Sequence, residues 1–221
     1  PEFRYPDSAR NTVRMRRELT SRDFDIAAPL GTGEAKVRVI GVVENQAPTR
    51  ALETVLPVED GVVQMDGIRD VCHVALVERH RATGTVTNGF VSGFGYDLPC
   101  ALASTVAHDS HHMIIVGTSK EAMALAGNRL RDVGGGVTMW RNGEELALIE
   151  LPIAGLMTDE SAYQVASKAD RLIDAMQRCG CKMNNAYMQH SLLALVVIPE
   201  LRISDQGLID VVKFEKTGLF V

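Results

Sequence analysis

Residues 106–112 read VAHDSHH and hold three of the six histidines of this chain, with a carboxylate and a hydroxyl between them. The apolar residues 113–117 follow at once, and such a short apolar run predicts a buried strand. A strand end is a place where a rigid scaffold can hold functional groups in the open. Asp109, Ser110 and His111 are therefore candidates for a binding site.

The cluster allows three interpretations. Imidazole and carboxylate groups bind zinc, iron or manganese, but His111 and His112 would point to opposite faces of a strand and could not both reach one ion without a bend. In a second interpretation, the histidines are hydrogen-bonded at a strand end and Asp109 fixes a turn. In a third, the cluster faces a cleft that another domain completes.

A second polar group, residues 78–81 (ERHR), follows a predicted strand and precedes a Thr-Gly pair. These side chains could bind an anion or the polar edge of a ligand, and His80 is the candidate among them. We favour the alternative of a solvated ion-pair network before a turn. His73 lies inside an apolar run and is predicted to be a core histidine. No catalytic residue and no metal ligand is assigned to this chain.

The composition restricts the class of protein. The 221 residues carry a net charge of -5, which argues against a general nucleic-acid binder. No apolar run approaches membrane-spanning length, and no signal-peptide pattern is present. The four cysteines show no framework spacing, so we expect reduced thiols in a cytoplasmic protein. The first residue is Pro1, which led us to expect a piece of a longer protein.

The periodicity of apolar residues predicts several strands and two covering helices. Strands are expected at residues 36–43, 71–77, 85–91, 113–117 and 192–198, with hairpins around 141–144 and 204–207. The pair Thr118 and Glu121 is a predicted capping box for a helix that ends before the glycines at 134–136. A second helix is expected over residues 160–178. These elements predict an α+β fold with a mostly antiparallel sheet and covering helices, not a TIM barrel.

Residues 1–34 are predicted to be an N-terminal arm or linker from a preceding domain, and residues 35–221 the α+β domain. The first 19 residues are rich in arginine, which suits either a phosphate-binding arm or an edge strand at residues 12–16. A short helix is expected to start at residues 20–23. The arginines in question are Arg4, Arg10, Arg14, Arg16 and Arg17.

Several blocks of the chain, in order, resemble the C-terminal domain of adenine deaminase, in the amidohydrolase superfamily. They cover most of the sequence and are specific as a set. His112 departs from the pattern, since the resemblance leads us to expect asparagine there in many relatives. The blocks are residues 77–80 (VERH), 89–95 (GFVSGFG), 104–111 (STVAHDSH), 134–136 (GGG), 151–157 (LPIAGLM), 195–201 (LVVIPEL) and 205–208 (DQGL).

This resemblance implies a sheet of about six strands and an enzyme that hydrolyses adenine to hypoxanthine and ammonia, in adenine catabolism and purine salvage. The attacking hydroxide would be bound to manganese, iron or zinc on an N-terminal (β/α)8 barrel domain, whose ligands begin with a His-x-His pair. This chain has no His-x-His pair, so it resembles the accessory domain without the catalytic one. No cofactor is expected in this chain.

The expected partners are that barrel, adenine and further copies in a homo-oligomer, with no nucleic acid and no membrane. His80, Asp109, Ser110 and His111 would then lie in the substrate cleft or at the domain interface. The alternative is a free-standing, non-catalytic domain that binds a small ligand or a protein partner. A self-sufficient metallohydrolase built on the histidine cluster is a third possibility.

Overall fold

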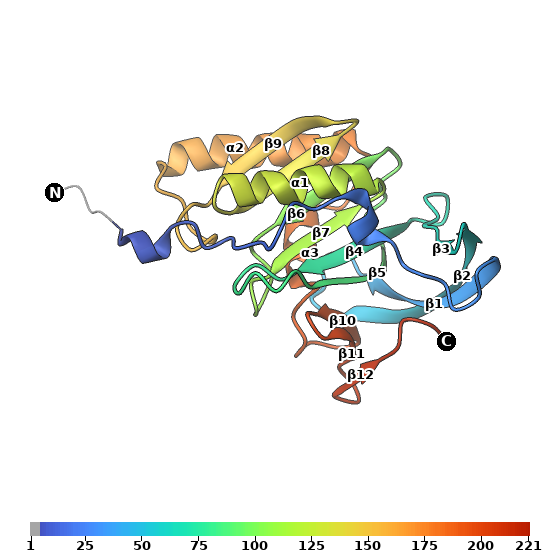
Figure 1. Ribbon diagram of the computed structural model, residues 1–221. Coiled ribbons are helices and arrows are strands. Elements are labelled where there is room, and N and C mark those ends of the chain that lie inside the picture. Colours follow the sequence, from blue (N-terminus) through green and yellow to red (C-terminus); the bar gives the residue numbers. More distant parts are fainter. Residues whose placement is uncertain (1–4) are drawn as a thin grey trace.

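The computed structural model describes residues 5–221, which form two sheets and three α-helices (Figure 1). The large sheet has nine strands in the order β3-β2-β1-β5-β4-β7-β6-β8-β9. Neighbouring strands are antiparallel except for β1 and β5, which pair in parallel. The small sheet has the order β10-β11-β12 and is antiparallel.

The large sheet consists of β1 Gly33–Val42, β2 Thr49–Glu59, β3 Val62–Val63, β4 Val71–Val77, β5 Val86–Ser92, β6 Cys100–Ser104, β7 Met113–Gly117, β8 Gly136–Arg141 and β9 Glu144–Glu150. The small sheet consists of β10 Leu201–Ser204, β11 Gly207–Asp210 and β12 Glu215–Thr217. The helices are α1 Lys120–Asp132, α2 Ala162–Arg178 and α3 Ala186–Leu192, with 3₁₀ turns η1 Asp7–Ala9 and η2 Ser21–Phe24.

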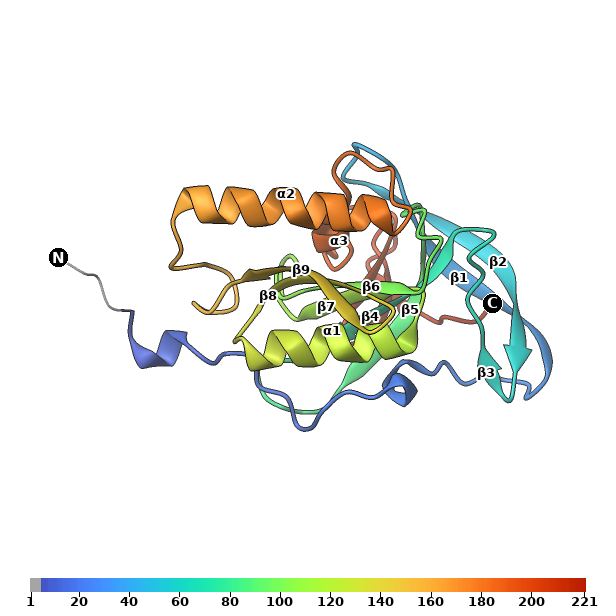
Figure 2. The same ribbon diagram turned by 90° about the horizontal axis from the view of Figure 1, so that it is seen from above.

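Helices cover both faces of the sheet, with α1 on one side and α2 on the other (Figure 2). Strands β4, β6 and β7 are therefore buried along their whole length, which explains their nearly continuous apolar sequences. On one face Leu130 of α1 packs in a cluster with Met113 and Ile115. On the other, Leu172 and Met176 of α2 pack in a cluster with residues of β6 and β7. The site described below lies at one end of these central strands.

The predicted α+β class is confirmed, with a mostly antiparallel sheet and no closed barrel. The turn between β8 and β9 has positive φ at both Asn142 and Gly143, as the hairpin signal requires. The capping box of η2 is formed by Thr20 and Asp23. Helix α1 is present, but its N-cap is Ser119, whose hydroxyl accepts from the Ala122 N–H. These elements follow from signals that act within a few residues.

Three predictions about strands are wrong. The large sheet has nine strands rather than six, because β2, β3 and β6 also pair into it. Residues 12–16 form no strand, although Val13 is buried against the α1 face. In the predicted strand 192–198, Leu192 ends α3 and the residues after it form turns, which bury Leu193 and leave Val197 exposed. Arg202 fixes these turns by donating to the carbonyls of Leu192 and Ile198, which a strand would have paired.

Other predictions concern single residues. His73 is buried, and its ring centroid lies 5.4 Å from that of Phe90, but its Nδ1 has no hydrogen-bond partner among the described residues. The four cysteines are free thiols and are buried. Arg4 lies outside the described residues, whereas Arg17 forms an ion pair with Asp23 of η2. No helix within residues 5–221 is long and apolar enough to cross a membrane.

Candidate functional site

Two loops meet at the end of the central strands. Strands β4 and β7 are antiparallel, with Val77 opposite Met113, so the loop that leaves β4 lies beside the loop that enters β7. His80 Nε2 donates a hydrogen bond of 2.8 Å to the Ser110 carbonyl and thereby joins the two loops. The ring centroids of His80 and His112 are 4.7 Å apart. The structure therefore brings together the two polar groups that the sequence presents 30 residues apart.

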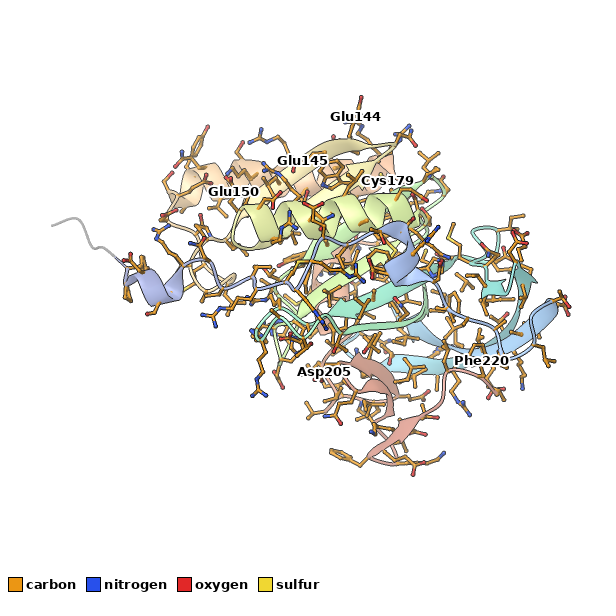
Figure 3. The ribbon with its side chains drawn as sticks, in the orientation of Figure 1. Glu144, Glu145, Glu150, Cys179, Asp205 and Phe220 are labelled. Atoms are coloured by element: carbon orange, nitrogen blue, oxygen red, sulfur yellow. The ribbon has the colours of Figure 1, made fainter. Side chains whose placement is uncertain are left out.

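A cavity of about 520 Å³ opens between these loops and the hairpin of β10 and β11. Figure 3 shows Asp205 on that hairpin, below the end of the large sheet. The volume is in the range of sites that bind small molecules, and every lining residue carries a polar side chain. Such a lining can offer hydrogen bonds to the edge of a ligand or order water beside one. The lining residues are Glu78, His80, Arg81, Thr83, Thr85, Ser110, His112 and Asp205.

The carboxylate of Glu78 holds the loop that leaves β4 through hydrogen bonds. It accepts hydrogen bonds from the N–H groups of His80 (2.5 Å), Arg81 (2.7 Å) and Thr83 (2.9 Å), and from the Thr83 hydroxyl (3.1 Å). Burial acts to raise the pKa of Glu78, but these donors outweigh it and lower the pKa to about 2. The carboxylate is therefore ionised, and backbone groups rather than an ion-pair network hold this loop.

Arg79 is buried, and its hydrogen bonds connect the loop that enters β7 to distant parts of the chain. Its guanidinium donates to the carbonyls of His111 (2.6 Å) and Ala154 (3.2 Å) and to the Thr12 hydroxyl (3.2 Å). Burial lowers the pKa of Arg79 to about 10, so the group remains charged at neutral pH. Gly155 leaves the space for it, because a Cβ atom there would lie 2.7 Å from Arg79 Nη1.

The histidine cluster forms a turn before β7. The His111 N–H donates to the Ala107 carbonyl (2.7 Å), and the Ala107 N–H donates to His111 Nδ1 (3.3 Å). Burial, and then the neighbouring His108, lower the pKa of His111. His111 is half-buried and Asp109 is exposed, and neither lines the cavity. Among the predicted candidates, only His80 and Ser110 line the cavity.

Sequence reasoning missed His112 and Asp205 as members of the site. His112 is buried, with Nε2 3.9 Å from Asp205 Oδ2 and with Nδ1 unpaired among the described residues. Burial, and then nearby His80, lower the pKa of His112. Its place in the VAHDSHH run was a usable signal, whereas nothing local marks Asp205. No three His, Cys, Asp or Glu residues within residues 5–221 converge as metal ligands would.

Comparison with known proteins agrees with the fold and the sequence blocks. The family described as "Adenine deaminase C-terminal domain" matches residues 46–215, and the chain belongs to this family. It is 67% identical over 221 residues to "Adenine deaminase 3" of Rhizobium meliloti and 66% identical over 221 residues to "Adenine deaminase" of Mesorhizobium japonicum. It is also 43% identical over 219 residues to "Adenine deaminase" of Moorella thermoacetica.

The alignments include 100%, 100% and 99% of this chain, respectively. The chain spans only 37%, 36% and 37% of the length of these three relatives. It corresponds to their C-terminal portion. A linked N-terminal domain is therefore implied for the longer protein.

Proposed function

We propose that this chain serves an adenine deaminase as its C-terminal domain, in an enzyme that hydrolyses adenine to hypoxanthine and ammonia. The observation that carries the proposal is the 67% identity to a relative of that name over all 221 residues. A preceding barrel domain would hold manganese, iron or zinc, since the described residues offer no group of three ligands. The metal would supply the activated water. The same proposal includes a cytoplasmic homo-oligomer acting in adenine catabolism and purine salvage.

The proposed role of the site is to complete the mouth of the active site on the barrel. The polar cavity supports this, because His80 and Ser110 line it at a loop junction held by Glu78 and Arg79. Asp109 lies next to Ser110 in the same turn and is exposed. These groups would hydrogen-bond the purine edge or order a loop that excludes water, which strengthens electrostatic catalysis.

The test uses the full-length enzyme with His80→Ala, Asp109→Ala, Ser110→Ala and His111→Ala, each compared with the wild type. We expect kcat/KM for ammonia release from adenine to fall about 5- to 100-fold, which corresponds to roughly 1–3 kcal/mol for one lost contact. Glu59→Gln is the control, because Glu59 is exposed at the far end of β2. If the four variants lose thermal stability but keep full activity per folded molecule, the cluster is structural.

A second test concerns the division of labour between domains. The 221-residue chain alone, supplied with iron, manganese or zinc, should release no ammonia from adenine. Chelation should inactivate the full-length enzyme, and one of these metals should restore it. Metal-dependent turnover by the isolated chain would contradict the assignment of catalysis to the preceding domain.

A further inference from the structure

An apolar groove of about 450 Å³ runs along α2 on the face of the sheet opposite α1. Figure 2 shows α2 and α3 on this face. The groove shares no lining residue with the polar cavity described above. Apolar side chains from several parts of the chain line it, among them Val137, Leu156, Val165, Ile173, Met183 and Met188. It is therefore a separate surface that the proposed function does not use.

The helix beside the groove is poorly covered. In α1, six of 13 residues are buried, whereas in the longer α2 only three of 17 residues are buried. Apolar side chains that line the groove consequently face solvent, with Ile173 49% and Met188 50% exposed. Exposed apolar side chains gathered on one face mark a surface that another element covers.

The lining suits protein side chains better than a small polar ligand. Its polar side chains come mainly from Gln177, Asn184 and Asn185. Among the described residues, no lining side chain has a buried polar atom that lacks a partner. The described part of the chain therefore leaves no buried polar group in the groove that a small polar ligand would have to satisfy. Apolar contacts dominate the fully buried core of protein interfaces.

The N-terminal segment of this chain lies at one end of the groove. The guanidinium of Arg10 donates to Asp159 (2.8 Å), and the Ala154 N–H donates to the Ala9 carbonyl (2.6 Å). Between these two contact points, Leu156 lines the groove. The segment and the N-terminal end of α2 lie on the same side of the molecule (Figure 1). Chain that precedes this domain therefore enters beside the groove.

We propose that the groove receives an apolar segment of the domain that precedes this chain in the full-length polypeptide. This inference rests on the proposed function, in which the chain is a C-terminal domain. Relatives carry nearly two thirds of their length outside the matched region, so a large partner is present in the same molecule. Covalent attachment beside the groove gives that partner a high effective concentration over any second copy in solution.

Cysteine labelling of the full-length protein tests the proposal without any substrate. Ile173→Cys and Met188→Cys place a thiol in the groove, and Ile68→Cys is the matched control, since Ile68 is 100% exposed in the loop before β4. The four native thiols of this chain are buried, and the full-length protein without an added cysteine measures the labelling of all native thiols. We expect a maleimide to react with the two groove thiols at least ten times more slowly than with the control. In this chain, the groove residues are about half as exposed as Ile68, which would slow the labelling of their thiols only about twofold.

A photoreactive maleimide on the groove thiol should in addition cross-link to a peptide of the preceding domain in the same molecule. Labelling at the rate of the control would overturn the proposal. Protection that disappears on dilution would assign the groove to a second copy and would also overturn it. Because labelling needs no adenine, a failure of the deaminase assay and a failure of this inference remain distinguishable.

Discussion

Replacing Arg79 with methionine should destabilise the domain more than any other single change at the site. The substitution removes a buried guanidinium and leaves the carbonyls of His111 and Ala154 and the hydroxyl of Thr12 without their donor. A fully buried acceptor that loses its partner costs about 1–3 kcal/mol, and these three acceptors are partly buried. Partial relaxation and entering water reduce the sum, so we expect a loss of about 3–5 kcal/mol in the free energy of unfolding.

Urea denaturation of the 221-residue chain, followed by circular dichroism, measures this loss. Thermal denaturation provides a second measurement. A chain of this size shifts its Tm by about 2–4 °C per kcal/mol, so the expected fall in Tm is about 6–20 °C. The free energy of unfolding of Arg79→Lys should lie between those of the wild type and Arg79→Met, because an ammonium group keeps the charge but cannot reach three separate acceptors. Hydrogen exchange should also accelerate in the turn at residues 107–111, which the guanidinium holds.

Arg81→Met is the matched control, two residues away. The Arg81 side chain is exposed, and within residues 5–221 its guanidinium has no hydrogen-bond partner, so its removal should cost less than about 0.5 kcal/mol. Equal unfolding free energies for the two methionine variants would refute the role assigned to Arg79. A large loss without faster exchange in the turn would refute the specific link to the histidine cluster.

Three further predictions concern stability. Glu78→Gln should lower the free energy of unfolding by about 1–3 kcal/mol at pH 7. In urea titrations, the difference in this free energy between the variant and the wild type should shrink as the pH falls from the ordinary pKa of 4.5 toward about 2, where the folded carboxylate protonates. Burial lowers the pKa of His190 from 6.5 to about 3, so this residue should lower the free energy of unfolding by about 1.4 kcal/mol for each unit that the pH falls between those values, as the unfolded chain takes up the proton. Burial likewise lowers the pKa of His73 to about 4, so His190→Phe should reduce the pH slope without abolishing it, and an unchanged slope would contradict the assignment. Gly155→Ala should cost about 1–3 kcal/mol by thermal denaturation, because φ is +70° and the new Cβ would press on Arg79, and a neutral result would refute the close approach.

The sequence predicted those elements whose signals are local. The N-cap of α2 is Ser161, which with Gln164 forms a capping box, and the apolar stripe of that helix extends over the predicted residues 160–178. Asn142 and Gly143 define the hairpin of β8 and β9 through their own backbone preferences. In each case the stabilising contact lies within a few residues, so its pattern is visible along the chain.

Long-range pairing decided the strands that sequence reasoning missed. Strand β6 reads CALAS, whose small side chains carry little strand preference, and it forms because β7 and β8 bond to it on both sides. The apolar run at residues 192–198 had the composition of a buried strand. Instead, the guanidinium of Arg202 donates hydrogen bonds to the carbonyls of Leu192 and Ile198, and the chain forms turns.

In the candidate site, too, some features were predicted from the sequence and others depend on the tertiary structure. The sequence by itself marked His80 and the cluster around Ser110 as polar groups at strand ends, and it showed the resemblance to a family. Only the tertiary structure placed them 2.8 Å apart, brought Asp205 to the same cavity and buried Arg79 among three acceptors from separate segments. A strand end can be read from residues in a row. The partner across a cavity depends on strand order and on which buried groups must be satisfied, and both are properties of the whole chain.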